Sequence, residues 1–211
     1  MNTINRVRFI LKPAVFAIAL VPFALAAAGI FGVAGQSLGA NPAEALLEHF
    51  GIWGLRFLLL GLAVTPIRKL TGLVWITRFR RMIGLFGAFY VALHFSVYLV
   101  LDQGLALAPI LEDIVKRPYI TVGFAAVLIL LAMTLTSTAR ARRRLGKRWQ
   151  QIHYGAYAAG ILGVWHFWWQ VKKDITEPLA YAIILAALLG LRLAWRLKRR
   201  SVPPARAPGV A

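Results

Sequence analysis

Six long apolar runs occupy most of the chain and constrain what it can fold into. They cover about residues 10–32, 51–65, 82–101, 119–137, 152–170 and 179–195. Because a helix needs roughly 20 apolar residues to cross a bilayer, six crossings use most of the 211 residues. We therefore predict an all-α integral membrane protein, a six-transmembrane-helix bundle that forms a single domain over residues 1–200. The second run is short unless its helix starts near Ala43, after a cap formed by Asn41 and Pro42.

The composition excludes several other classes of protein. Only 15% of the residues are charged and 60% are apolar, whereas a soluble domain is about 25% charged. Neither a soluble enzyme nor a disordered chain is therefore expected. The absence of cysteine excludes iron–sulfur clusters and cysteine-ligated zinc. The sequence also has no His-Glu-x-x-His, Walker or GxGxxG motif, and we assign no catalytic residue.

The two ends of the chain can each be interpreted from their composition. The first apolar run follows Arg6, Arg8 and Lys12 and contains three consecutive alanines at 26–28, a pattern shared with signal peptides. Its apolar stretch is longer than a typical signal-peptide core, so we expect a retained membrane anchor. Residues 201–211 are rich in proline and are expected to be a disordered cytoplasmic tail.

The distribution of charge predicts the topology. Lys and Arg cluster, with no acidic residue among them, at the N-terminus, between the second and third runs, between the fourth and fifth runs, and at the C-terminus. The alternate segments contain all seven Asp and Glu residues. The positive-inside rule then places both termini in the cytoplasm. We interpret the net charge of +18 as a topology signal and an anchor to anionic membrane lipid, and we expect no nucleic-acid partner.

A few ionisable side chains lie in or beside the apolar runs, where burial in lipid is costly and function is the default explanation. They are Arg56, His94, His153 and His166, with His49 just outside the second run. His94 and His166 lie in the third and fifth runs, which both lead from the cytoplasm outward. Both imidazoles are therefore expected at similar depth in the outer half of the bilayer. Two imidazoles that face each other across a bundle can supply both axial ligands of one haem iron.

Small residues precede both histidines at helical spacing. Gly84, Gly87 and Val91 lead to His94, and Ala156, Ala159 and Gly163 lead to His166. Small residues allow a flat macrocycle or a neighbouring backbone to approach closely. The alternative is plain helix packing, with each histidine hydrogen bonded to a serine or a carbonyl. The parallel occurrence of the two stripes favours haem.

The other ionisable residues have weaker interpretations. His153 precedes His166 by 13 residues, so one flat helix face cannot present both imidazoles. It is a candidate ligand on the cytoplasmic side with a non-histidine partner, or an ordinary interfacial histidine. Arg56 follows His49 by seven residues on the same face. Arg56 is a candidate partner for a haem propionate, because guanidinium pairs well with carboxylate, or it is an arginine that extends toward water.

These residues resemble a known family. Thr136-Ser137-Thr138, followed by the stretch Leu145-Gly146-Lys147-x-Trp149-x-x-x-His153, is similar to the loop-to-helix motif of the ferric-reductase-like transmembrane family. Further similarities, to the MsrQ (YedZ) family of haem-binding membrane subunits, are Asn41-Pro42, His49-Phe50, Thr65-Pro66, Arg80-Arg81-x-x-Gly84-Leu85, Arg117-Pro118-Tyr119, and the helices of His94 and His166. The similar residues extend from about 41 to 173, which is most of the chain.

The resemblance implies a non-catalytic electron-transfer subunit that contains haem b, in the bacterial inner membrane. Its electrons come from the quinone pool or a cytosolic flavin reductase. They go to a periplasmic molybdopterin-containing methionine sulfoxide reductase, which repairs oxidised periplasmic proteins. The family's haem ligands correspond to His94 and His166, and a further histidine corresponds to His153. Larger ferric reductases carry two histidines in each of the third and fifth spans, whereas this chain has one in the third. A flavin mononucleotide (FMN) cofactor is implied by the resemblance alone.

Two other functions remain open from the sequence. A ferric reductase or a cytochrome b with a different acceptor would use the same haem site. A small transporter would require discontinuous helices and an inverted repeat. Pro13 and Pro66 lie near helix ends and no inverted repeat is visible, so a transporter is less favoured.

Overall fold

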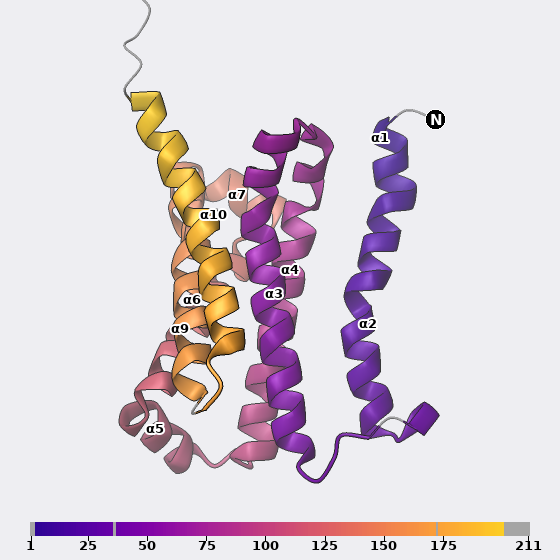
Figure 1. The fold of residues 1–211 in the computed structure, drawn as a ribbon, viewed down its shortest axis with the longest axis vertical. Coiled ribbons are helices and arrows are strands. Elements are labelled where there is room, and N and C mark those ends of the chain that lie inside the picture. Colours follow the sequence, from indigo (N-terminus) through magenta and orange to yellow (C-terminus); the bar gives the residue numbers. More distant parts are fainter. Residues whose placement is uncertain (1–2, 36, 172, 201–211) are drawn as a thin grey trace, which may run out of the picture.

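The computed structural model describes residues 3–35, 37–171 and 173–200. The predicted cytoplasmic tail at 201–211 lies outside these residues. Every regular element among the described residues is helical, as predicted (Figure 1). In chain order the elements are α1 (Thr3–Arg6), η1 (Val7–Leu11), α2 (Lys12–Ile30), η2 (Val33–Gly35), α3 (Pro42–Thr71), η3 (Val74–Phe79), α4 (Arg80–Val97), η4 (Tyr98–Asp102), α5 (Leu107–Lys116), α6 (Pro118–Leu135), α7 (Ala139–Leu145), α8 (Lys147–His153), α9 (Gly155–Gln170) and α10 (Thr176–Arg200).

Five helical segments of the described chain are long and apolar enough to cross a membrane. They are Ile4–Ile30, Pro42–Thr71, Val74–Asp102, Pro118–Leu135 and Thr176–Lys198. The fifth predicted run differs, because the chain turns at Tyr154 and separates α8 from α9. This break leaves α9 with only 16 residues, about 24 Å of helix at 1.5 Å per residue. The chain is thus a multi-pass membrane protein with five candidate spans and one shorter helix beside them.

Prolines and local caps fix where the helices begin. Pro42 and Pro118 occupy the first turns of α3 and α6, where a missing N–H costs nothing. The predicted cap at Asn41 is confirmed: its side chain accepts from the Glu44 N–H at 3.3 Å and donates to the Glu44 carboxylate at 3.0 Å. Since α3 begins at Pro42, nine residues before the predicted run, His49 lies inside a helix.

The long helices pack in pairs. α3 packs chiefly against α4, and α6 packs chiefly against α9, with α10 covering α3 and α9. Aromatic rings fill the interface between α3 and α4, where Phe57 stacks on Tyr90 with centroids 5.4 Å apart and planes at 4°. Tyr90 is fully buried. On the other side of α3, a second apolar cluster joins Leu55 and Leu62 to Val164 of α9 and Leu185 of α10.

Tyr90 also connects the bundle to α2, which lies at the edge of the bundle (Figure 1). Its hydroxyl donates to the Ala19 carbonyl at 2.6 Å and accepts from the Phe23 N–H at 3.1 Å. These two backbone groups are four residues apart and would normally bond to each other within a helix. The hydroxyl therefore contacts both backbone groups of one turn of α2, next to Pro22 inside the helix, where a proline kink is expected.

The two ends of the bundle differ in composition. Figure 1 shows α1, the connection between α3 and α4, α7 and the last turns of α10 at one end, and α5 at the other. The first end carries the arginine-rich helix α7, whose sequence is ARARRRL. There Gly146 turns the chain with φ 51°, a conformation suited to glycine. Trp149 then donates its indole N–H to the Thr136 carbonyl at 2.9 Å and ties α8 to the end of α6.

Candidate haem site

His94 and His166 come together from α4 and α9. Their ring centroids are 6.1 Å apart and the ring planes are inclined at 80°. Each imidazole lies toward the C-terminal end of its helix, and both are partly buried. The sequence predicted that these two histidines lie at similar depth and face each other, and the structure brings them into contact. Their role as metal ligands is a separate question, which the surrounding geometry addresses.

A backbone carbonyl on a neighbouring helix orients each ring. His94 Nδ1 lies 2.9 Å from the Leu47 carbonyl of α3, and His166 Nδ1 lies 2.7 Å from the Tyr119 carbonyl of α6. A carbonyl oxygen only accepts, so in each ring Nδ1 must carry the hydrogen. The lone pair of each neutral imidazole is therefore on Nε2, the tautomer that ligates metal when Nδ1 is held by a carbonyl.

Glycine makes room for each ring one helical turn beyond its carbonyl. A Cβ atom added at Gly51 would lie 3.0 Å from His94 Nδ1, and one at Gly123 would lie 2.7 Å from His166 Nδ1. Both distances are too short for a real side chain without displacing the ring. Sequence reasoning did not single out these glycines, because the available signal, a small residue on a helix that bears no histidine, is common in membrane proteins.

The separation of the two ring centroids is compatible with one metal ion bound by both imidazoles. A metal–imidazole nitrogen bond is about 2 Å, and the ring centre lies about 1 Å beyond the nitrogen, so two such ligands place their centroids about 6 Å apart. No group of three or more His, Cys, Asp or Glu side chains that could hold a bare metal ion occurs in the described part of the chain. A pair of imidazoles without further donors suits haem, whose macrocycle supplies the remaining iron ligands.

The small-residue stripes serve helix packing as well. A Cβ atom at Gly87 would lie 3.4 Å from Leu58, and one at Gly163 would lie 3.4 Å from Leu55. Both leucines belong to α3, so the stripes of α4 and α9 bring these helices close to the central helix. The two readings of the sequence are thus compatible, because close packing against α3 brings the helices of both histidines together.

Arg56 connects α3 to α10. Its Nε donates to the Tyr181 hydroxyl at 2.8 Å, and one terminal nitrogen lies 3.9 Å from the Glu177 carboxylate. The guanidinium carbon also lies 4.8 Å from the centre of the Trp53 ring. The side chain of Arg56, which the sequence suggested as a partner for a haem propionate, therefore has partners within the protein.

The remaining two histidines lie apart from this pair. His49 Nε2 donates to the Pro22 carbonyl of α2 at 2.9 Å, so this histidine contacts α2 at its internal proline. On an ideal helix it lies about 200° around α3 from Leu47. His153, near the arginine-rich end, stacks on Trp149 with centroids 4.0 Å apart and bonds through Nδ1 to the Trp149 carbonyl at 3.0 Å.

Arg192 is a polar residue whose position the sequence did not reveal, because it was counted among the basic residues of the C-terminal end. One of its terminal nitrogens donates to the Tyr157 hydroxyl at 2.8 Å, and another donates to the Leu62 carbonyl. Its Nε is buried and has no hydrogen-bond partner among the described residues. This arginine connects α10 to both α3 and α9.

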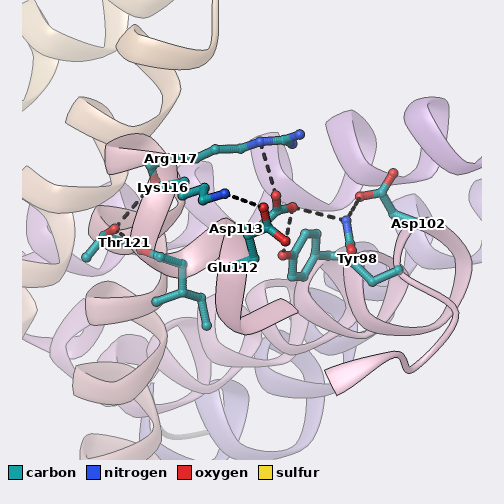
Figure 2. A network of polar contacts seen from close by, with 9 residues as sticks. Tyr98, Asp102, Glu112, Asp113, Lys116, Arg117 and Thr121 are labelled. Carbon is teal, nitrogen blue, oxygen red and sulfur yellow. Dashed lines mark hydrogen bonds and ion pairs between the residues drawn. The ribbon is translucent and has the colours of Figure 1, made fainter. Parts of the chain in front are cut away.

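A polar network joins η4, α5 and the start of α6 (Figure 2). Its centre is Asp113 of α5, a carboxylate that is only 9% exposed. Asp113 accepts from Tyr98 at 3.3 Å and from Gln103 at 3.1 Å, and it lies 3.1 Å from Nε of Arg117. Tyr98 follows His94 by one turn, and Arg117 lies two residues before Tyr119. The network therefore braces the segment that carries His94 and the segment that carries Tyr119, whose carbonyl orients His166.

One further pattern of catalytic type occurs in the sequence. Residues 35–39 match GxSxG, which in hydrolases forms a sharp turn between a strand and a helix. Here Gly35 ends η2, Ser37 and Gly39 precede α3, and the Ser37 hydroxyl accepts from the Gly39 N–H at 3.2 Å. This segment follows and precedes helices, so it does not have the geometry of a nucleophile elbow.

Comparisons with known proteins agree with this arrangement. The chain matches the family described as "Ferric reductase like transmembrane component" over residues 50–164. It is 47% identical over 207 residues to the "Protein-methionine-sulfoxide reductase heme-binding subunit MsrQ" of Xanthomonas oryzae pv. oryzae, which covers 93% of this chain and 94% of that protein. The protein of the same name from Bordetella pertussis is 46% identical over 192 residues, or 90% of this chain and 92% of that protein. No solved structure gives a significant match.

Proposed function

The chain belongs to the MsrQ family of ferric-reductase-like membrane proteins, and from this premise we propose that it carries electrons across the bacterial inner membrane to a methionine sulfoxide reductase. The observation that carries the proposal is the pair of His94 and His166, with ring centroids 6.1 Å apart and both Nε2 lone pairs free of the carbonyl anchors. Relatives of the chain are named as haem-binding subunits of that reductase system.

His94 and His166 hold haem b in this proposal. Haem supplies reversible one-electron chemistry when it is bound. The chain itself carries out no covalent chemistry. Its α3 and α6 hold the imidazoles through the carbonyls of Leu47 and Tyr119. An iron held by both histidines would suit electron transfer rather than oxygen chemistry. Arg56 supplies a positive charge on α3 near this end of the bundle.

The direction of transfer follows from the proposed topology. We place the arginine-rich end of the bundle in the cytoplasm, with α9 as a sixth crossing and both termini inside. The His94 and His166 pair then lies in the outer half of the membrane, below the polar network of Asp113. A molybdopterin-containing reductase subunit in the periplasm would receive electrons at that surface. The donor is the quinone pool or a cytosolic flavin reductase.

In this proposal, His153, His49 and FMN take no part in the site formed by His94 and His166. His153 is a candidate for a group at the cytoplasmic end, since its Nδ1 is held by the Trp149 carbonyl and its lone pair is on Nε2. His49 donates through Nε2 to α2, and its Nδ1 carries the lone pair. FMN has no residue assigned to it.

The proposal is tested on the full chain purified in detergent. The pyridine haemochrome assay and the reduced visible spectrum are recorded for the unchanged protein and for His94→Ala, His166→Ala and His153→Ala. Loss of most of the red-shifted reduced bands in the first two variants, with retention in His153→Ala, is the expected result. A full spectrum in both His94→Ala and His166→Ala would exclude this pair as the ligands.

A second measurement tests the acceptor. The purified chain is reduced with a quinol, and the catalytic subunit is added with or without methionine sulfoxide. Reoxidation of the haem bands only when methionine sulfoxide is present supports the proposed acceptor. Reoxidation by ferric citrate alone would instead identify the ferric reductase alternative.

A further inference from the structure

α2 contacts the bundle along only part of its length. Near its middle and end it touches α4 through the bridge of Tyr90 and through Phe23 and Phe89, whose ring centroids are 5.7 Å apart. Closer to its N-terminus, Phe16 meets Phe86 edge-on with centroids 5.2 Å apart. Alongside this contact, α2 and α4 leave an open hollow between them.

This hollow has a volume of about 490 Å³, which is within the usual range for a ligand site of about 300–1,000 Å³. Its walls are apolar, and include Phe16, Leu20 and Phe89. Lys12 of α2, with Arg78 and Arg81 from the connection to α4 and its first turn, supplies its polar groups. A second hollow of about 560 Å³, between the N-terminal helices and the α3–α4 connection, shares Arg78 with it.

The three cations are not neutralised by the protein. No acidic residue lines either hollow. The side chains of Lys12, Arg78 and Arg81 form no ion pair or hydrogen bond with the rest of the described chain. Arg78 and Arg81 are exposed and Lys12 is partly buried. Three like charges around one apolar hollow repel one another, so an anionic group between them would be stabilised.

The combination of an apolar wall and a cationic rim selects the occupant. A water-soluble anion would gain nothing from the phenylalanine and leucine walls, and a neutral lipid would gain nothing from three cations. We propose that the groove between α2 and α4 binds one anionic phospholipid. Its phosphate contacts Lys12, Arg78 and Arg81, and an acyl chain lies along Phe16 and Leu20. The lipid completes the contact of α2 with the bundle where protein side chains leave a hollow.

Native mass spectrometry of the full chain in detergent tests this inference. The protein is titrated with phosphatidylglycerol and, separately, with phosphatidylcholine of the same acyl chains. We expect one phosphatidylglycerol to bind at least about tenfold more tightly than phosphatidylcholine, because each basic residue near an anionic headgroup strengthens attachment several-fold. The triple variant Lys12→Gln, Arg78→Gln, Arg81→Gln should lose this preference.

A matched variant separates the groove from the general positive charge. Arg140→Gln, Arg142→Gln, Arg143→Gln removes three charges from α7 at the same end of the bundle and should keep the preference. Equal loss in the two triple variants would overturn the proposal, because it would show diffuse attraction. Leu20→Trp keeps the rim but fills part of the hollow, and it should weaken phosphatidylglycerol binding about tenfold.

Two competition experiments identify the source of the phosphate. Neither inorganic phosphate nor FMN should displace the bound phosphatidylglycerol at millimolar concentration. Displacement by inorganic phosphate would show a site for small anions, and displacement by FMN would show a site for the flavin. Either result, or unchanged lipid binding in Leu20→Trp, would overturn the assignment. These measurements do not depend on haem or on electron transfer.

Discussion

His94 and His166 are each hydrogen bonded, through Nδ1, to the backbone carbonyl that lies 47 residues earlier in the chain. In both cases a glycine one turn beyond that carbonyl makes room for the ring. The helix pairs α3–α4 and α6–α9 therefore orient one imidazole each by the same device. The two rings meet with centroids 6.1 Å apart, and no recognisable sequence repeat accompanies this similarity.

Substituting these glycines should displace the ligands. In Gly123→Ala the new methyl group would lie 2.7 Å from His166 Nδ1, and in Gly51→Ala it would lie 3.0 Å from His94 Nδ1. Overpacking of this kind costs typically about 1–3 kcal/mol. We expect less haem per chain in both variants, with the larger loss in Gly123→Ala, measured by the pyridine haemochrome assay. Gly84→Ala is the matched control, because a Cβ atom there meets nothing within 4 Å, and it should retain its haem.

The sequence predicted the helical class and the pairing of His94 with His166 because hydropathy and loop charge determine depth and direction. It could not show which backbone groups hold the rings. The carbonyls of Leu47 and Tyr119 belong to residues with no distinguishing side chain, and their use depends on how helices far apart in the chain pack together. Gly51 and Gly123 were missed for the same reason.

Two variants should separate the effect of the Arg56 charge from the effect of its hydrogen bond. Arg56→Leu removes a positive charge. Because the loss of this charge favours the oxidised form of a nearby haem, we expect a lower midpoint potential. Tyr181→Phe removes the 2.8 Å hydrogen bond but keeps the charge, so the potential should stay unchanged. Both variants should unfold at lower temperature, since each breaks the link between α3 and α10. Equal midpoint potentials for the unchanged protein and Arg56→Leu in a spectroscopic redox titration would contradict an effect of the Arg56 charge on haem.

Tyr90→Phe should destabilise the attachment of α2. The variant leaves the Ala19 carbonyl and the Phe23 N–H without the hydroxyl that bridges them, and an unsatisfied buried polar group costs about 1–3 kcal/mol. Thermal unfolding in detergent should occur at a lower temperature, with the haem spectrum retained. Tyr154→Phe removes an exposed hydroxyl that accepts from Gln150 at 3.1 Å and should leave the unfolding temperature unchanged.

The carboxylate of Asp113 should contribute more to the stability of the fold than the carboxylate of its neighbour Glu112 on α5. Asp113→Asn replaces the buried acceptor of Tyr98, Gln103 and Arg117, and we expect a loss of about 1–3 kcal/mol in the free energy of unfolding. Glu112→Gln disrupts an exposed pair with Lys116, and such a pair contributes about 0–1 kcal/mol. Equal unfolding temperatures in the two variants would show that the network does not brace this end of the bundle.

Some predictions from the sequence needed correction for physical reasons. The fifth apolar run was expected to be one span; it begins in the last residues of α8, and a turn at Tyr154 separates these from α9, which contains the rest of the run. Hydropathy cannot detect such a break, because every residue near it is compatible with a helix. Arg192 was assigned to the basic C-terminal cluster by its position in the chain, yet it reaches Tyr157 and the Leu62 carbonyl within the bundle. Only the packing of α10 against α3 and α9 reveals this.

The arrangement of one oriented imidazole in each helical hairpin has a consequence for biogenesis. The first hairpin, α3 and α4, contains both the imidazole of His94 and the carbonyl that orients it, so this contact needs no later part of the chain. The second half arrives only with α6 and α9. In the proposed function, a nascent chain arrested before residue 166 would present only one oriented imidazole. Haem would then be held by both histidines only after α9 has been made.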